Sequence, residues 1–140
     1  MEKKIKIETK WLQKMSFEAK IDGHKIIVDA AEEVGGENKG PRPKPLMLLA
    51  LAGCTGMDVV SILKKMRVEF DDLDVDVEAE MTEEHPKYFS SMKVIYTIKG
   101  KNIQKEKVEQ AVTLSQEKYC GVSALYKKAI PVKFEIIIKD

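Results

Sequence analysis

Two cysteines are the residues of this sequence whose type most readily supports chemistry. Cys54 lies in the segment LAGCTGMDVV, and Cys120 follows 66 residues later in QEKYCGVSAL. In a reducing compartment, a cysteine pair is more often catalytic, metal-binding or inert than joined in a structural disulfide. A free cysteine can also serve as a small buried hydrophobic residue, and this alternative stays open for Cys54 when its segment is considered alone.

The segment around Cys54 predicts a helix from Pro45 to Lys65. It reads PLMLLALAGCTGMDVVSILKK, which is rich in strong helix formers, and a proline suits the first helical turn. Because the run is apolar on nearly every side, we expect a buried central helix, and Asp58 interrupts the run too early for a membrane span. One helical face carries mostly small residues that would let another segment approach closely: Ala50, Gly53, Cys54, Met57 and Ser61.

Few other side chains form a recognisable reactive pattern. The two histidines, His24 and His85, and the cysteines show no CxxC or HxxxH spacing, so we expect no metal site. Asp58 lies one helical turn after Cys54, where a carboxylate facing the thiol would disfavour the thiolate. A structural, hydrogen-bonded role is the preferred interpretation of Asp58. No phosphate-binding loop is expected, because GGENKG lacks the GK[ST] ending.

Length and charge limit the class of protein. The chain has 140 residues, which is enough for one domain over residues 1–140 with a sizeable core. The net charge of +1 is spread over interspersed acidic and basic residues, so we expect neither a nucleic-acid partner nor a membrane partner. The N-terminal residues lack an apolar signal core, and we therefore expect a cytoplasmic protein.

Alternating apolar and charged residues predict strands on both sides of the central helix. The expected strands cover residues 4–11, 17–21, 24–29, 74–81, 92–98 and 132–138. Asp22-Gly23 predicts a hairpin, and residues 30–44 predict a loop. A further helix is expected over about Ile103 to Lys118 with Asn102 as its N-cap, followed by a short helix capped by Ser123. Runs of antiparallel strands flanking one helix indicate an α+β fold.

The two cysteine segments together resemble the OsmC/Ohr family of thiol-dependent peroxidases. The resemblance rests on PLMLLALAGCTGMDVVSIL and, 66 residues after its cysteine, on the cysteine of EKYCGVS. It extends over nearly the whole chain in element order and length, and CTGMDVVSILKK resembles most closely a less characterised branch of the family. The resemblance implies an OsmC-like α+β fold and an intertwined homodimer, with both cysteines beside the dimer interface.

The resemblance also implies an antioxidant activity that needs no bound cofactor. Cys54 would attack the O–O bond of a hydroperoxide, preferably an organic one, and become a sulfenic acid. Cys120 would condense with it to a disulfide, which an external dithiol would then reduce. The alternative is a non-catalytic OsmC-like dimer that binds a ligand or responds to redox state but has lost peroxidase activity.

The sequence departs from the family in the residues that support the thiolate. The family places an arginine and a glutamate beside its attacking cysteine, but the position of that glutamate holds Lys44 here. Cys54 lies too far into the predicted helix for the helix N-terminus to favour its thiolate. Arg42 is the best match for the family's arginine, and either Arg42 or Lys44 is the predicted thiolate-stabilising residue.

Overall fold

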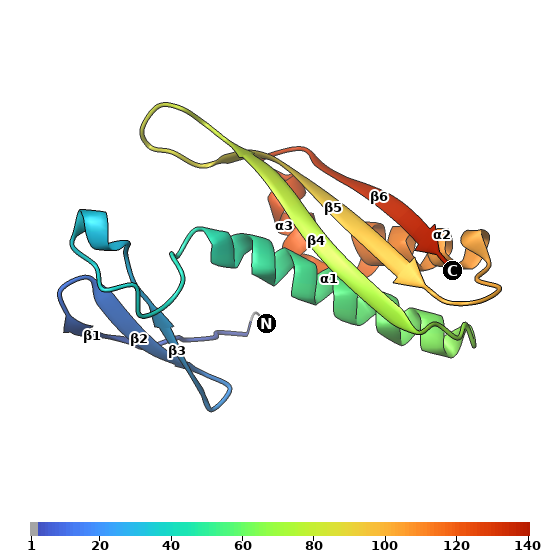
Figure 1. Ribbon diagram of the computed structural model, residues 1–140, viewed down its shortest axis with the longest axis horizontal. Helices are drawn as coiled ribbons and strands as arrows, with labels where there is room; N and C mark the ends of the chain where they lie inside the picture. The colour runs from blue at the N-terminus through green and yellow to red at the C-terminus, as the bar shows by residue number, and fades with distance from the viewer. Residues whose placement is uncertain (1–2) are drawn as a thin grey trace. The chain divides into compact units, whose positions relative to one another are not determined.

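The computed structural model describes residues 3–140 and divides into two compact units. The first unit extends to Met47, and the second extends from Leu48 to Asp140. Residues 3–140 contain two three-stranded sheets and three α-helices, which confirms the α+β class (Figure 1). The prediction of a single domain over residues 1–140 stays a prediction.

The first unit is built on an antiparallel sheet of β1 (Thr9–Gln13), β2 (Ser16–Ile21) and β3 (His24–Val28). The residues of the predicted hairpin, Asp22 and Gly23, have φ values of 52° and 81°. Positive φ at both central residues is the geometry of a type I′ turn, which confirms the hairpin.

The first strand is shorter at its start than predicted. In the observed register Thr9 faces Ala19, so β2 ends before it can supply a partner for Ile5. Ile5 and Ile7 both lie outside the sheet, and both side chains are exposed. The loop that follows β3 contains one short 3-10 helix, η1 (Glu32–Val34).

The second unit contains the sheet of β4 (Asp72–Met81), β5 (Phe89–Lys99) and β6 (Val132–Lys139). Its helical elements are α1 (Pro45–Lys65), α2 (Lys105–Leu114), the π-helix η2 (Ser115–Tyr119) and α3 (Gly121–Lys127). The first residues of α1 still belong to the first unit. Figure 1 shows these helices against one face of the sheet. The bounds of α1 are those that the sequence predicted.

The pairing of the last strand corrects the expectation of antiparallel strands throughout. β4 and β5 pair antiparallel, but β5 and β6 pair parallel, with Tyr96 opposite Ile136. Parallel neighbours require a long crossover, and α2, η2 and α3 supply it between β5 and β6. This crossover carries Cys120 to the helical side of the sheet.

The core of the second unit lies between this sheet and the helices. Alternate residues of β5 are fully or nearly fully buried: Met92, Val94, Tyr96 and Ile98. One row of α1, spaced every four residues, packs into the same core: Leu51, Thr55, Val59 and Leu63. The row has the spacing of a single helical face.

The remaining faces of α1 are less buried within one chain than the sequence predicted. Leu49 is 64% exposed and Met57 is 76% exposed, because one sheet can cover only one side of a helix. The face of small residues is not the packed face, since nothing would meet a Cβ placed on Gly53 within 4 Å. By length and composition α1 is apolar enough to cross a membrane despite Asp58, with a mean hydropathy of 2.0.

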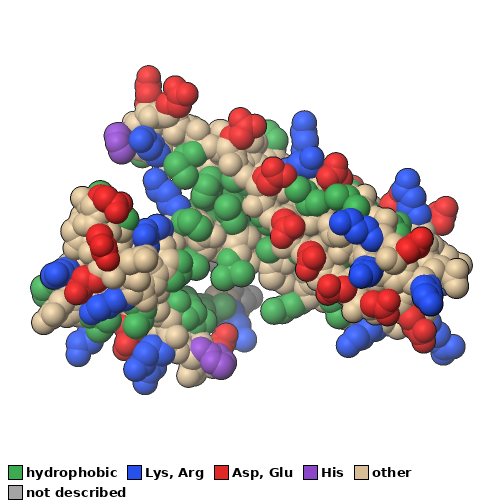
Figure 2. Space-filling model, viewed as in Figure 1, with side chains coloured by type: hydrophobic (Ala, Val, Ile, Leu, Met, Phe, Trp, Pro, Cys, Tyr) green, Lys and Arg blue, Asp and Glu red, His purple; other side chains and the backbone are tan. Residues whose placement is uncertain are grey.

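Charged side chains of both signs cover the second unit and the first. On the face shown in Figure 2, Lys and Arg side chains are interspersed with Asp and Glu side chains, in line with the net charge of +1. The expected absence of nucleic-acid and membrane partners stays a prediction.

Both predicted helix caps after β5 are wrong. Asn102 has a φ of 57°, a left-handed conformation that turns the chain out of β5, and α2 begins only after its N-cap Gln104. The helix also changes from α to π geometry at Ser115. Ser123 lies inside α3, and the N-cap of α3 is Cys120, whose sulfur accepts a hydrogen bond from the Ser123 N–H.

Candidate active site

The fold brings the two cysteines together. The Sγ atoms of Cys54 and Cys120 and a carboxylate oxygen of Asp58 all lie within 4.8 Å of one another. Both cysteines are free thiols. Cys54 and Asp58 project from the same face of α1 because they are four residues apart, and Cys120 comes from the junction of η2 and α3. A disulfide would require the sulfurs to approach to about 2.05 Å.

The π-helix determines where Cys120 lies. The Cys120 N–H donates to the Ser115 carbonyl oxygen at 2.8 Å, five residues earlier, and this bond closes the wide turn. After it the backbone becomes extended at Cys120, with φ −79° and ψ 103°. The Cys120 Sγ then accepts the Ser123 N–H at 3.3 Å. Short π segments are frequent at functional sites, and this one directs the second thiol at α1.

The two thiols differ in their environments. Cys54 is half-buried, whereas Cys120 is 2% exposed. Burial raises the pKa of the Cys120 thiol to about 11, the Ser123 N–H opposes this shift, and the neighbouring Cys54 adds to it. Cys120 is therefore a neutral thiol near pH 7, and Cys54 is the thiol that solvent reaches.

A chain of buried hydrogen bonds leads to Asp58 from the core. Thr55 Oγ1 lies 2.6 Å from Tyr96 Oη and 2.7 Å from Ser115 Oγ. Ser115 Oγ donates to Asp58 Oδ2 at 2.9 Å, and Gln116 Nε2 donates to Tyr96 Oη at 2.8 Å. Each of these groups is buried except Asp58, which is half-buried.

Counting protons gives this chain a direction. A hydroxyl has one proton, so Ser115, which donates to Asp58, must accept from Thr55. Thr55 must then accept from Tyr96, which in turn accepts from Gln116. Every donor in this chain points towards the Asp58 carboxylate, which accepts the last hydrogen bond. The predicted hydrogen-bonded role of Asp58 therefore applies together with its position beside the thiols.

Two further hydrogen bonds join α3 to η2 on either side of Cys120. Ser123 Oγ donates to Gln116 Oε1 at 2.6 Å, and Lys127 Nζ donates to the Gln116 carbonyl oxygen at 2.9 Å. Sequence analysis missed Thr55, Tyr96, Ser115 and Gln116 as site residues. The available signal was a polar residue, Thr55, inside an otherwise apolar row of α1.

Arg42 and Lys44 lie in the first unit, whereas the cysteines lie in the second. Arg42 Nη1 donates to Asn38 Oδ1 at 2.9 Å and to the Gly40 carbonyl oxygen at 3.0 Å. Within residues 3–140, no lysine or arginine forms an ion pair with Asp58. The predicted thiolate-stabilising role of Arg42 or Lys44 stays a prediction.

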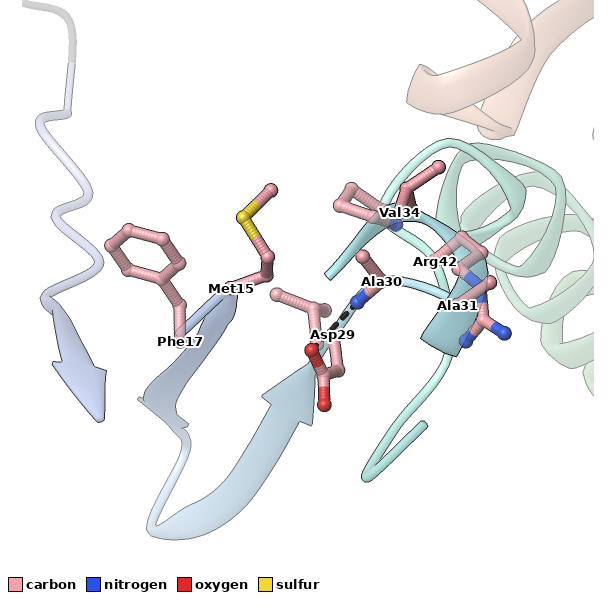
Figure 3. A pocket seen from close by; sticks show the side chains of 9 residues that line it. Met15, Phe17, Asp29, Ala30, Ala31, Val34 and Arg42 are labelled. Atoms are coloured by element: carbon pink, nitrogen blue, oxygen red, sulfur yellow. Dashed lines mark hydrogen bonds between the residues drawn. The ribbon is translucent and has the colours of Figure 1, made fainter. Parts of the chain in front are cut away.

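The first unit contains a separate pocket of about 320 Å³, shown in Figure 3. Its lining is mostly apolar, and Asp29 and Arg42 are its charged residues. The Asp29 carboxylate accepts backbone N–H groups of Ala30, Glu37 and Lys39 at 2.7, 3.2 and 3.0 Å. These bonds, that of Lys39 above all, hold the pKa of Asp29 below its usual value. Asp29 therefore organises the loop and is not a free reactive group.

Comparison with known proteins gives the chain a family. Residues 36–135 match the family model described as OsmC-like protein. The chain is 32% identical over 136 residues to Protein YhfA of Escherichia coli, a match that covers 95% of this chain and 98% of YhfA. A crystal structure from Aquifex aeolicus is 32% identical, with a TM-score of 0.82 and full coverage of both chains.

A more distant structure shares the fold. It is an organic hydroperoxide resistance protein from Elizabethkingia anophelis, 16% identical, with a TM-score of 0.71 and coverage of 98% of this chain and 99% of that chain. The family match, the YhfA identity and the shared fold agree with the two cysteine segments that first suggested the assignment. This protein belongs to the OsmC-like family.

Proposed function

We propose that this protein reduces organic hydroperoxides through the thiols of Cys54 and Cys120, as part of a cytoplasmic defence against oxidative stress. The observation that carries the proposal is the approach of the two Sγ atoms to within 4.8 Å across 66 residues of sequence. Membership in the OsmC-like family supports a redox role. A reducing cytoplasm would keep both thiols free between turnovers.

The difference in exposure between the two thiols supports a separate role for each of them. The thiolate of Cys54 attacks the peroxide, the O–O bond breaks, an alcohol leaves with a proton, and Cys54 becomes a sulfenic acid. The sulfur of Cys120 then attacks the Cys54 sulfur, and the sulfenic oxygen leaves as water while the disulfide forms. An external dithiol then reduces this disulfide by thiol–disulfide exchange, becomes oxidised to a disulfide itself, and returns both cysteines to thiols.

The carboxyl group beside the two thiols leads us to expect slow peroxide reduction. The Asp58 carboxylate lies beside both sulfurs, and an adjacent negative charge disfavours a thiolate. A free cysteine is only a few per cent thiolate near pH 7, so we expect a rate that rises with pH between about 7 and 9. A cation from Arg42 or Lys44 would raise the rate at neutral pH.

A homodimer is part of this proposal. α1 leaves Leu49 and Met57 exposed, although it forms the centre of the second unit. A second copy of the chain placed on this face would bury these side chains, and twofold pairing of identical surfaces is the commonest oligomeric arrangement. The apolar cover would also make the surroundings of Cys54 more suitable for an organic hydroperoxide.

The test is the initial rate of cumene hydroperoxide consumption in the presence of a dithiol reductant. Cys54→Ser should abolish the activity. Cys120→Ser should permit one turnover and then stop, because the sulfenic acid has no partner thiol. Mass spectrometry of the wild-type protein after one equivalent of peroxide should show an intramolecular disulfide. An unchanged rate in Cys54→Ser would contradict the proposal.

Two further variants test the source of the cation. If Arg42 or Lys44 stabilises the thiolate, Arg42→Ala or Lys44→Ala should move the pH–rate profile to higher pH. Arg67→Ala is the control, since Arg67 follows α1 at its opposite end and should leave the profile unchanged. A fast rate that does not depend on pH above 6 would require another cation.

One observation favours the alternative, a non-catalytic member of the family. The carboxylate that lies beside the thiols has no lysine or arginine ion pair within residues 3–140. A protein that binds a ligand or senses redox state without turnover would tolerate this arrangement. Two unreacted thiols after treatment with one equivalent of cumene hydroperoxide would support this alternative.

A further inference from the structure

The peroxidase proposal gives the two thiols of the cysteine site a role, but it gives no favourable role to the carboxyl group of Asp58 beside them. Two thiols and a carboxyl group lie within 4.8 Å of one another, and the carboxyl group has no cationic side chain paired with it within residues 3–140. We propose that Cys54, Asp58 and Cys120 bind a thiophilic divalent cation, with Zn²⁺ as the preferred ion. This proposal does not depend on peroxidase activity.

The ligand types and their spacing fit this ion. Zn²⁺ is bound by cysteine sulfur at about 2.3 Å and by carboxylate oxygen at about 2.0–2.2 Å, so a tetrahedral site holds its ligand atoms roughly 3.5–3.8 Å apart. The observed separations of up to 4.8 Å would need a contraction of at most about 1.0–1.3 Å. Three protein ligands leave a fourth position for water, and the partial exposure of Cys54 gives that position access to solvent.

Two of the three ligands are already oriented by neighbouring donors. Ser115 Oγ donates to Asp58 Oδ2 at 2.9 Å, and the Ser123 N–H donates to Cys120 Sγ at 3.3 Å. Hydrogen bonds to metal ligands commonly hold them in the binding geometry. Here the Ser115 hydroxyl is the last donor of the hydrogen-bond chain that runs from Gln116 to Asp58.

The charges also balance better with the ion than without it. On binding, both thiol protons leave to solvent, so two thiolates and one carboxylate surround a doubly charged cation and the site carries one net negative charge. Without a cation, the same three groups can ionise together only against their mutual repulsion. Ion binding would occupy both sulfurs, and disulfide formation would remove both sulfurs from the ion.

The chain order explains why spacing rules overlook this set. Cys54 and Asp58 form a ligand pair four residues apart on one helical face, which is the spacing that places two ligands side by side. The third ligand, Cys120, arrives through the crossover between β5 and β6. The sequence therefore lacks a CxxC motif, although the folded chain has two thiols at one place.

The first experiment measures binding by the full-length, tag-free and fully reduced protein. Zn²⁺ is titrated in competition with a chromophoric chelator, and Co²⁺ serves as a spectroscopic probe. We expect one ion per chain and a cobalt spectrum with a thiolate charge-transfer band. A protein that shows no such band and does not compete with the chelator would overturn the proposal without recourse to any variant.

The second experiment assigns the ligands. Cys54→Ser, Cys120→Ser and Asp58→Asn should each weaken Zn²⁺ binding at least tenfold, and Ser115→Ala should weaken it roughly 10-fold through the loss of orientation. Asp76→Asn is the matched control, because Asp76 is an exposed carboxylate on β4. Binding that is unchanged in Cys54→Ser and Asp58→Asn, or that is lost on replacing His24 or His85, would overturn the assignment.

A third measurement needs no substitution and separates this proposal from the peroxidase. Oxidation of the wild-type protein to the Cys54–Cys120 disulfide should abolish Zn²⁺ binding, and reduction by a dithiol should restore it. Zn²⁺ binding by the reduced protein, together with no peroxide turnover by the zinc-free reduced protein, would sustain the metal site and reject the peroxidase. Zn²⁺ binding that persists in the fully oxidised protein would overturn the metal site.

Discussion

Asp58 shows how one residue can combine two interpretations that the sequence presents as alternatives. It accepts a hydrogen bond from Ser115, as a structural polar residue would, and its carboxylate also lies beside both sulfurs. The hydroxyl donors of Tyr96, Thr55 and Ser115 all point along the chain towards this carboxylate. A residue that opposes thiolate formation by charge is for the same reason a suitable ligand for a cation.

Asp29 gives a prediction about pH at the scale of one residue. The backbone N–H of Lys39 lowers the pKa of Asp29 most, so its ionised form stabilises the loop after β3. A lowered folded-state pKa gives stability that is present above the usual carboxyl pKa and is lost as pH falls through the lower, folded-state value. Asp29→Asn should therefore increase amide hydrogen exchange at Glu37 and Lys39 near neutral pH.

The difference between wild type and Asp29→Asn should shrink as the solution becomes acidic, because the wild-type carboxylate is then protonated too. Glu32→Gln is a suitable control, since Glu32 is an exposed loop carboxylate. Equal exchange in wild type and Asp29→Asn at pH 7 would contradict the assigned role.

At the scale of elements, the site depends on a crossover that contains an irregular turn. α2 ends at Leu114, and the π-helix η2 continues to Tyr119 before the chain becomes extended at Cys120. The wide turn places Ser115 and Cys120 on the side of α1, where Thr55 and Asp58 meet them. A regular α-helix through the same residues would direct the second thiol elsewhere.

Thr55 provides a prediction about how α1 is joined to η2 and β5. Thr55→Val keeps the shape of the side chain but leaves the buried hydroxyls of Tyr96 and Ser115 without a partner. Leaving buried polar groups unsatisfied should lower the free energy of unfolding by about 1–3 kcal/mol. Urea denaturation of the reduced protein measures this loss.

Thr97→Val is the matched control, because Thr97 is a half-buried threonine of β5 outside this network. It should change the free energy of unfolding by less than Thr55→Val does. Since removal of both partners can be nearly neutral, Thr55→Val combined with Tyr96→Phe should cost less than the sum of the single changes. Additive losses would show that the hydroxyls do not act as a network.

At the scale of the whole molecule, the exposed side of α1 predicts self-association. Met57 is 76% exposed on a helix with a mean hydropathy of 2.0. If a second copy covers this side, Met57→Glu would bury a charge in the interface and should shift the protein from dimer to monomer. Sedimentation velocity at micromolar concentration measures the shift.

Met81→Glu is the control for this prediction, because Met81 is an exposed methionine at the end of β4. This variant should remain dimeric. A wild-type protein that sediments as a monomer at micromolar concentration would contradict the dimer, whatever the variants do.

Local signals in the sequence determined those parts of the structure that depend on neighbouring residues. The apolar run predicted the bounds of α1, Asp22-Gly23 predicted the hairpin, and the two cysteine segments identified the family. Helix propensity and turn geometry act over a few residues, so a sequence window contains the relevant physics. The α+β class followed from the order of these elements.

Only the tertiary structure decided that β6 pairs parallel to β5 and that a single row of α1 is buried. It also decided that Gln104 and Cys120, and not Asn102 and Ser123, are the N-caps of α2 and α3. It also decided the hydrogen-bond chain from Tyr96 to Asp58. Each of these features joins segments that are distant in sequence, and their partners exist only once the crossover packs on the sheet. A cap or a buried hydroxyl is selected by the donors and acceptors around it, and those are absent from the local sequence.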